Sequence, residues 1–117
     1  MASDGLLDRG QGHPRAAGTF PRFLAEFAGR DGLSLYDAVE KMTALPADRL
    51  KLTRKGRLNV GADADITVFD PEKIRDRATF RDPVLAPEGI DYVLIGGEIA
   101  AKDCRIVSNT LGRAVRG

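Results

Sequence analysis

Apolar residues in the first half of the chain recur at the spacing of a helix. Residues 1–18 lack this periodicity and carry several glycines, which predicts an irregular loop. Thr19 can then cap a helix that has Pro21 in its first turn, and Gly29 and Gly32 stop it. The apolar stripe predicted for this helix is Phe20, Phe23, Leu24 and Phe27.

A second and a third helix are predicted to follow. Ser34 and Asp37 resemble a capping box with Asp in place of Glu, so Ser34 opens the second helix. Pro46 begins a short third helix that ends at Leu50, since proline is tolerated at a first helical position. Core packing is the simplest role for the Phe and Met side chains of these helices. The apolar stripe of the second helix is Leu35, Ala38, Val39, Met42 and Leu45.

The character of the sequence changes from helix to strand after Leu52. Residues 64–69 contain β-preferring side chains and predict a strand, which Asp70 and Pro71 end. The charged stretch at residues 72–83 is expected to be a solvated, irregular connection on the surface.

A hairpin closes the predicted pattern. Residues 90–95 and 98–101 read as two strands joined by a tight turn at Gly96 and Gly97, and residues 104–107 fit a final short strand. The tail that follows lacks further pattern. The order of loop, helices and strand cluster predicts an α+β fold.

Composition limits the function classes. A length of 117 residues favours one domain, and 18 basic against 17 acidic residues give a net charge of +1. Nucleic acid and membrane are therefore not expected as partners. No apolar run approaches the roughly 20 residues of a spanning helix, and the first twenty residues carry charges in place of a signal-peptide core, so neither feature is expected. Cys104 is the single cysteine, which suits a reducing cytoplasm and predicts a packing role for this residue.

The opening segment holds the candidate chemistry. Asp4 lies next to Gly5, which allows close backbone approach, and His13 and Arg15 follow in the same predicted loop. A carboxylate can act as a general base, and an arginine fork can hold a carboxylate bidentately. A plain turn and a surface charge would explain the same residues. His13 is the only histidine, so the chain by itself is expected to bind no metal.

Four runs of the sequence carry a family resemblance. They are HPRAAGTFPRFL (residues 13–24), SLYDAVEKMTALPADRLKL (34–52), GRLNVGADADITVFDPEKIRDRATFRDP (56–83) and GIDYVLIGGEIA (89–100). In this order they resemble the carboxy-terminal part of N-acyl-D-amino-acid deacylases, the D-aminoacylase branch of the metal-dependent amidohydrolase superfamily. The H-P-R-x-x-G-T-F-P-R and D-P-x-x-[IV]-R-D patterns are specific to this branch, whereas G-x-x-A-D-[ILV] occurs across the superfamily. Gly96 replaces the Asn customary in the closing hairpin.

The resemblance implies an architecture and a reaction. Residues 1–52 would be the last loop and helices of a (β/α)₈ barrel, and residues 53–117 the carboxy-terminal strands of a small β-sandwich. In the complete enzymes zinc activates a water that attacks the amide of an N-acyl-D-amino acid. A barrel typically needs about 250 residues, so this barrel would be incomplete.

Specific roles follow from the matched motifs. Asp4 lies in the S-D-G motif and would be the catalytic general acid/base, while Arg15 would hold the α-carboxylate of the substrate. His13 would help to shape the substrate-binding loop. The GLLDRGQG stretch departs from the family between Gly5 and His13, which leaves the role of Asp8 open.

The family's zinc ligands are not in this chain, so three hypotheses follow. The first is a deacylase portion that is inactive alone. The second is a non-catalytic interaction subunit that completes a barrel supplied by another chain, because the barrel-facing helix sides would otherwise be exposed. The third is a stand-alone binding module built on Arg15, although half an active-site wall offers no enclosed pocket.

Overall fold

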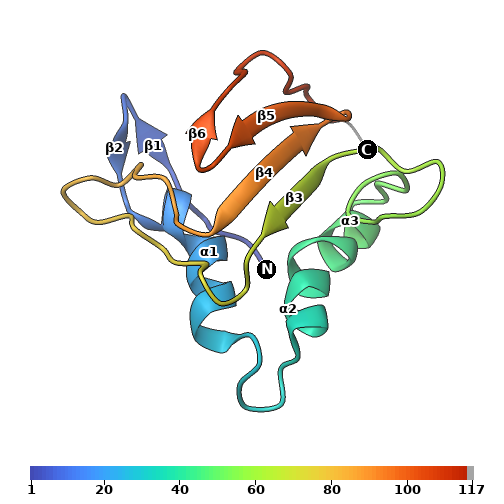
Figure 1. Cartoon of the computed structure of the whole chain (residues 1–117), viewed down its shortest axis with the longest axis horizontal. Helices are drawn as coiled ribbons and strands as arrows, with labels where there is room; N and C mark the ends of the chain where they lie inside the picture. Colours follow the sequence, from blue (N-terminus) through green and yellow to red (C-terminus); the bar gives the residue numbers. More distant parts are fainter. Residues whose placement is uncertain (116–117) are drawn as a thin grey trace.

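The computed structural model of the chain describes residues 1–115. Over these residues a small two-stranded hairpin comes first, three helices follow, and a four-stranded antiparallel sheet comes last (Figure 1). The predicted α+β class is therefore confirmed. Arg116 and Gly117, at the end of the predicted tail, lie outside the described residues. None of the helices in residues 1–115 is long and apolar enough to cross a membrane.

The loop predicted for residues 1–18 contains a hairpin. Strands β1 (Leu7–Asp8) and β2 (Gln11–Gly12) pair antiparallel through a turn at Arg9 and Gly10. Both turn residues have positive φ, 50° and 79°, as a tight two-residue hairpin turn requires. Arginine is not among the residues that favour this conformation, so only Gly10 signalled the turn in the sequence.

Helix α1 (Arg15–Phe27) begins one turn before the predicted cap at Thr19, so that prediction is wrong. Pro14 occupies the N-cap position with φ −57°, and its carbonyl accepts a hydrogen bond from Gly18 N at 2.9 Å. The fixed φ of proline suits the start of a helix. The Thr19 hydroxyl instead donates back to the carbonyl of Arg15 at 2.7 Å, inside the helix.

Helix α2 (Leu35–Met42) has the predicted capping box. Ser34 Oγ accepts a hydrogen bond from Asp37 N at 3.0 Å, and the Asp37 carboxylate accepts one from Ser34 N at 3.3 Å. Helix α3 (Ala44–Arg49) begins earlier than the predicted proline start, which places Leu45 in α3 and corrects the stripe predicted for the second helix.

The sheet is a meander. Its strands, in spatial order, are β3 (Ile66–Phe69), β4 (Ile90–Ile95), β5 (Glu98–Lys102) and β6 (Arg105–Ile106). The predicted β4 and its turn are confirmed: Gly96 and Gly97 have φ 60° and 87°. Strand β3 is shorter than predicted, and β5 is one residue longer. Cys104, with φ 59°, lies in the turn before β6 and not in a strand.

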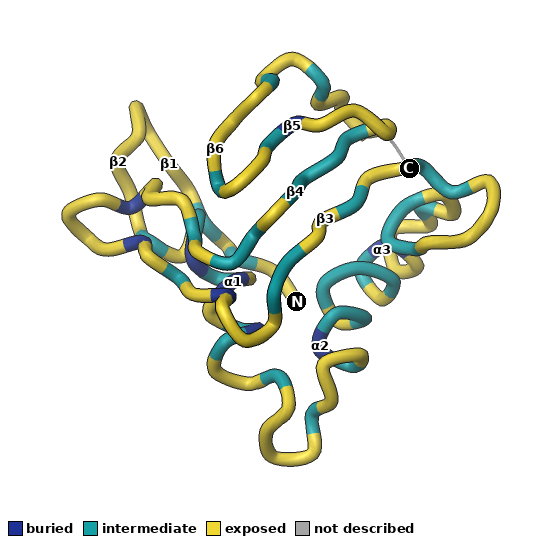
Figure 2. Tube along the Cα trace, in the orientation of Figure 1, coloured by how far each residue is buried: buried dark blue, intermediate teal, exposed yellow. Residues whose placement is uncertain are grey.

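The connecting segment, residues 70–89, joins β3 to β4 and runs beside α1 (Figure 1). The prediction that residues 72–83 form a solvated stretch is wrong in part. Ile74 is only 2% exposed, and Ala78 and Pro83 are buried as well (Figure 2). The charged residues between them hid this burial from the sequence pattern.

The centre of the core joins the helices to the connecting segment. Leu24 of α1, Ala38 of α2 and Ile74 pack together, with partly buried neighbours from both helices around them. In strands β3–β6 only Ala100 is buried (Figure 2). The sheet therefore leaves most of its apolar side chains partly open to solvent.

Candidate functional site

The predicted general base lies in the loop before β1. Asp4 has φ 50°, in the left-handed region, and its side chain is 91% exposed. Aspartate tolerates this conformation better than most residues, but such positions are uncommon and occur more often at functional sites. Gly5 N donates to Ser3 Oγ at 3.2 Å, which closes a local turn around Asp4.

A close backbone approach brings Asp4 to the start of α1. A Cβ on Gly5 would lie 2.5 Å from Ala16 Cα, so only glycine fits at this position. Arg15, the neighbour of Ala16, places Nη2 at 3.3 Å from Asp4 Oδ2. The ion pair stands in open solvent and so contributes little to stability.

His13 contacts the same arginine through the backbone. Arg15 N donates to His13 Nδ1 at 3.1 Å. The structure therefore brings together the three predicted site residues, since Arg15 meets Asp4 with its side chain and His13 with its main chain. The chemical roles predicted for them stay predictions.

Phe80 is a neighbour of this group that sequence reasoning missed. Its ring packs edge to face on the His13 ring, with centroids 5.0 Å apart and an interplanar angle of 76°. The ring is nevertheless 76% exposed. Phe80 lies in a run that carries the family resemblance, but its charged sequence neighbours pointed to a solvated stretch.

Asp76 makes a second contact between the connecting segment and α1 that the sequence did not reveal. Its side chain is only 9% exposed; Oδ2 lies 3.0 Å from Arg22 Nη2, and Oδ1 accepts a hydrogen bond from Ala78 N at 2.8 Å. A Cβ on Gly18 would collide with this carboxylate. The two runs specific to the deacylase branch thus contact each other.

Asp65, in the G-x-x-A-D element, supports the β4–β5 hairpin. Gly96 N donates to Asp65 Oδ1 at 2.9 Å, and Lys55 pairs with Asp65 and, at 3.1 Å, with Asp63. The hydrogen bond from Lys55 and then that from Gly96 lower the pKa of Asp65. The hydrogen bonds to Asp65 and Asp63 raise the pKa of Lys55. The element is therefore a structural support of the turn.

Among residues 1–115 no three His, Cys, Asp or Glu side chains converge so as to hold a metal ion. His13, the only histidine, already uses Nδ1 to accept a hydrogen bond. Whether the isolated chain binds zinc stays a prediction for experiment.

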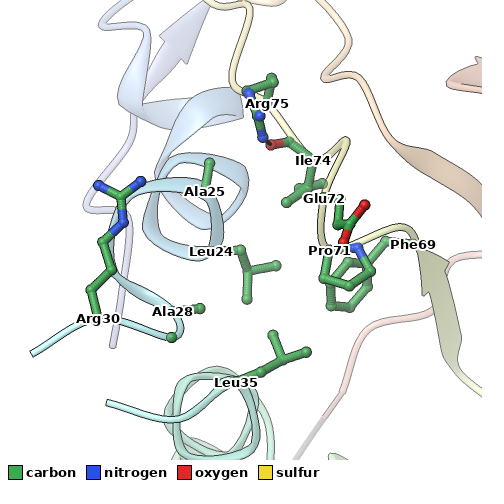
Figure 3. Close-up of a pocket in the computed structure, with 11 residues that line it drawn as sticks. Leu24, Ala25, Ala28, Arg30, Leu35, Phe69, Pro71, Glu72, Ile74 and Arg75 are labelled. Atoms are coloured by element: carbon green, nitrogen blue, oxygen red, sulfur yellow. Dashed lines mark hydrogen bonds between the residues drawn. The ribbon is translucent and has the colours of Figure 1, made fainter. Parts of the chain in front are cut away.

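A hollow of about 360 Å³ lies between α1, the start of α2 and the connecting segment (Figure 3). Leu24, Leu35 and Phe69 contribute apolar side chains, and Arg75 is among the polar lining residues. None of the three predicted site residues lines this hollow. The Asp4 carboxylate is instead on open surface, where the described residues alone would not enclose a small molecule.

Comparison with known proteins decides the family. A model of the amidohydrolase family matches residues 1–101. The chain belongs to the amidohydrolase family. It is 47% identical to N-acyl-D-glutamate deacylase and 40% identical to D-aminoacylase, both of Alcaligenes xylosoxydans xylosoxydans, over 83% and 98% of its length. The predicted resemblance to N-acyl-D-amino-acid deacylases is thereby confirmed.

Solved amidohydrolase structures share the fold of this chain. D-aminoacylase matches 99% of the chain with a TM-score of 0.89 and 37% identity. N-acyl-D-glutamate deacylase from Bordetella bronchiseptica, in complex with zinc and a phosphonate inhibitor, matches 90% with a TM-score of 0.78 and 40% identity. D-aminoacylase has a binuclear metal centre. The chain spans 20% and 24% of the two Alcaligenes proteins and 25% and 23% of the two solved chains.

Proposed function

We propose that this amidohydrolase chain is the carboxy-terminal portion of a zinc-dependent enzyme that hydrolyses the amide bond of N-acyl-D-amino acids. The Asp4–Arg15 pair carries the proposal, because a candidate proton carrier and a carboxylate-binding fork lie 3.3 Å apart. An N-acyl-amino acid presents one group for each, an amide to cleave and an α-carboxylate to hold. The names of the deacylase relatives support the same substrate class.

Arg15 provides the binding half of the site. Its guanidinium is planar and permanently charged, and it can donate two parallel hydrogen bonds to a carboxylate. Asp4 compensates this charge in the structure. A substrate carboxylate would take over as the partner of Arg15 and release Asp4 for proton transfer.

Asp4 provides the proton-transfer half. Its carboxylate would accept a proton from the water that attacks the amide carbon, and would then deliver it to the leaving amine. The C–O bond forms, the C–N bond breaks, and Asp4 returns to its ionised form. His13 would shape the loop by holding Arg15 N.

The proposal also assigns the architecture. Residues 1–52 supply the last loop and helices of an incomplete (β/α)₈ barrel, and residues 53–117 supply carboxy-terminal strands of a composite β-sandwich. The zinc ligands then belong to the part of the enzyme outside this chain, so the chain alone is inactive. The single cysteine, Cys104, supports a cytoplasmic location.

A second candidate function is a non-catalytic interaction subunit that completes a barrel supplied by another chain. A chain that supplies the rest of the barrel would cover exposed surface: this chain exposes 8,644 Å², whereas area scaling gives about 6,200 Å² for a folded chain of its mass. The excess of about 2,400 Å² on one partner is of the order buried in large obligate interfaces. Exposed apolar side chains include Phe20, Phe27, Leu35, Tyr36 and Leu45 on the helices and Val68, Ile99 and Ile106 on the sheet.

Reconstitution tests both functions. In the presence of zinc, the chain is mixed with a D-aminoacylase polypeptide from which the quarter that matches this chain has been removed. The release of D-amino acid from N-acetyl-D-amino acids is then measured. We expect neither piece to be active alone and the mixture to be active, with activity lost when the chain carries Asp4→Asn.

The other outcomes separate the candidates. A stable but inactive complex would support the interaction subunit. Turnover by the chain alone, with stoichiometric zinc, would overturn its proposed inactivity. A chain that stays monomeric, binds no apolar dye and does not associate with the larger piece would count against both functions.

A further inference from the structure

The connecting segment is fastened at two places that flank Arg15 in the sequence, one within α1 and one just before it. One fastening involves Asp76 and the middle of α1, and the other involves Phe80 and the residue two positions before Arg15. Figure 1 shows this segment beside α1 and the β1–β2 hairpin. Charged and exposed positions dominate the segment, so these two contacts need a reason.

The Asp76 carboxylate packs directly against α1. The carboxylate is satisfied by Arg22 at 3.0 Å and by Ala78 N at 2.8 Å, and it occupies the space that the missing side chain of Gly18 leaves. With the side chain only 9% exposed, this ion pair is better shielded than the Asp4–Arg15 pair. It fixes the connecting segment against the first two turns of α1.

The Phe80 contact involves His13, which precedes Arg15 in the sequence. The Phe80 ring packs on the His13 ring, and His13 Nδ1 accepts the hydrogen bond from Arg15 N at 3.1 Å. A contact that orients the His13 imidazole therefore also orients Nδ1, the atom that accepts the hydrogen bond from the Arg15 main chain. Phe80 stays 76% exposed, so burial of its own surface in the described residues does not account for its position.

We propose that Asp76 and Phe80 are positioning residues for Arg15, acting through α1 and through His13. The inference rests on the proposed function, in which Arg15 holds the substrate carboxylate. The side chain of an exposed arginine samples many rotamers. Contacts that hold the backbone before and after Arg15 reduce the number of positions from which its guanidinium must reach a productive geometry. Loss of either contact would weaken substrate binding more than the chemical step, because neither residue touches the reacting atoms.

The isolated chain gives the first test. His13 is the only histidine, so its ring protons are assigned without ambiguity by NMR. We expect Phe80→Leu to abolish the ring-current shift of the His13 protons and to move the Arg15 amide signal, while Phe80→Tyr preserves both. The matched control is Phe27→Leu, which removes a ring that is also exposed but stacks on Phe23. Unchanged His13 and Arg15 signals in Phe80→Leu, in a chain that circular dichroism shows to be folded, would overturn the proposal.

The reconstituted enzyme gives the second test. We expect Phe80→Leu and Asp76→Asn each to raise KM about tenfold and to change kcat by less than about twofold. Phe80→Tyr should restore the normal KM, and the control Asp82→Asn should leave it unchanged. An inactive wild-type assembly would overturn the proposed function, whereas an active assembly in which Phe80→Leu and Asp76→Asn keep the normal KM would overturn only the positioning role.

Discussion

Arg15 Nη2 lies 3.3 Å from Asp4 Oδ2, so each of the two proposed functional groups neutralises the other. Gly5 makes the pair possible, because its missing side chain lets the loop approach Ala16. A substrate carboxylate that binds Arg15 must take the place of Asp4. Since both side chains are substantially exposed, the exchange costs little free energy.

Asp4→Asn is expected to separate the two tasks in the reconstituted enzyme. It removes the proton carrier, so kcat should fall by about 10²–10⁴-fold. KM should stay the same or fall slightly, because Arg15 loses its competing partner. Steady-state kinetics with an N-acetyl-D-amino acid measures both, and Asp8→Asn in β1 is the matched control. A normal kcat in Asp4→Asn would remove this residue from the mechanism.

Arg15→Gln is expected to act mainly on binding. A charge-assisted hydrogen bond contributes about 1.5–3 kcal/mol, so KM should rise by about 10–100-fold. The same substitution at Arg9, at the tip of the β1–β2 turn, controls for loss of a nearby positive charge. Equal KM values for the two variants would argue that Arg15 does not hold the substrate.

Gly18→Ala is expected to destabilise the chain, against the usual trend. Alanine in a helix interior is normally about 1 kcal/mol more favourable than glycine. In α1 the new Cβ would collide with the Asp76 carboxylate, and we expect a net loss of about 1–2 kcal/mol in urea unfolding. In an Asp76→Ala background the same change should become neutral or stabilising. Stabilisation by Gly18→Ala in the otherwise unchanged chain would show that Asp76 moves aside freely.

Asp65→Asn is expected to lower stability in a pH-dependent way. The pKa of Asp65 is depressed by Lys55 and Gly96, so its contribution is present above the unfolded value of about 3.9 and is lost as the pH falls through the folded value. Thermal unfolding should therefore show a lower Tm for the variant at pH 7 and a difference that vanishes in strong acid. Asp91→Asn, in the same sheet, serves as the control. A Tm difference independent of pH would contradict the ionic account.

Ser34→Ala is expected to cost about 1 kcal/mol of unfolding free energy, because it removes the side chain that caps α2. Urea unfolding followed by circular dichroism measures the loss. Ser108→Ala, beyond β6, should stay within about 0.5 kcal/mol of the unchanged chain. A loss of similar size in both variants would show that the capping box contributes no specific stability.

Local signals in the sequence predicted several elements well. The capping box at Ser34 and the Gly96–Gly97 turn involve residues within a few positions of each other, so their geometry depends on nearby chemistry alone. The start of α1 was missed because the predicted apolar stripe begins only at Phe20, several residues after the N-cap at Pro14. The β1–β2 hairpin was missed because Arg9 adopts a positive φ, and arginine is not a residue type that indicates such a turn.

The α+β class, the family resemblance and the three candidate site residues could all be predicted from the amino-acid sequence, because they depend on short motifs and their order. The contact of Asp4 with Arg15, and those of Asp76 with α1 and of Phe80 with His13, are visible only in the folded chain. Contacts between residues some sixty positions apart depend on how the core around Leu24 and Ile74 draws the connecting segment against the helix. Periodicity along the chain carries no record of that packing, because it describes each segment without its neighbours in space.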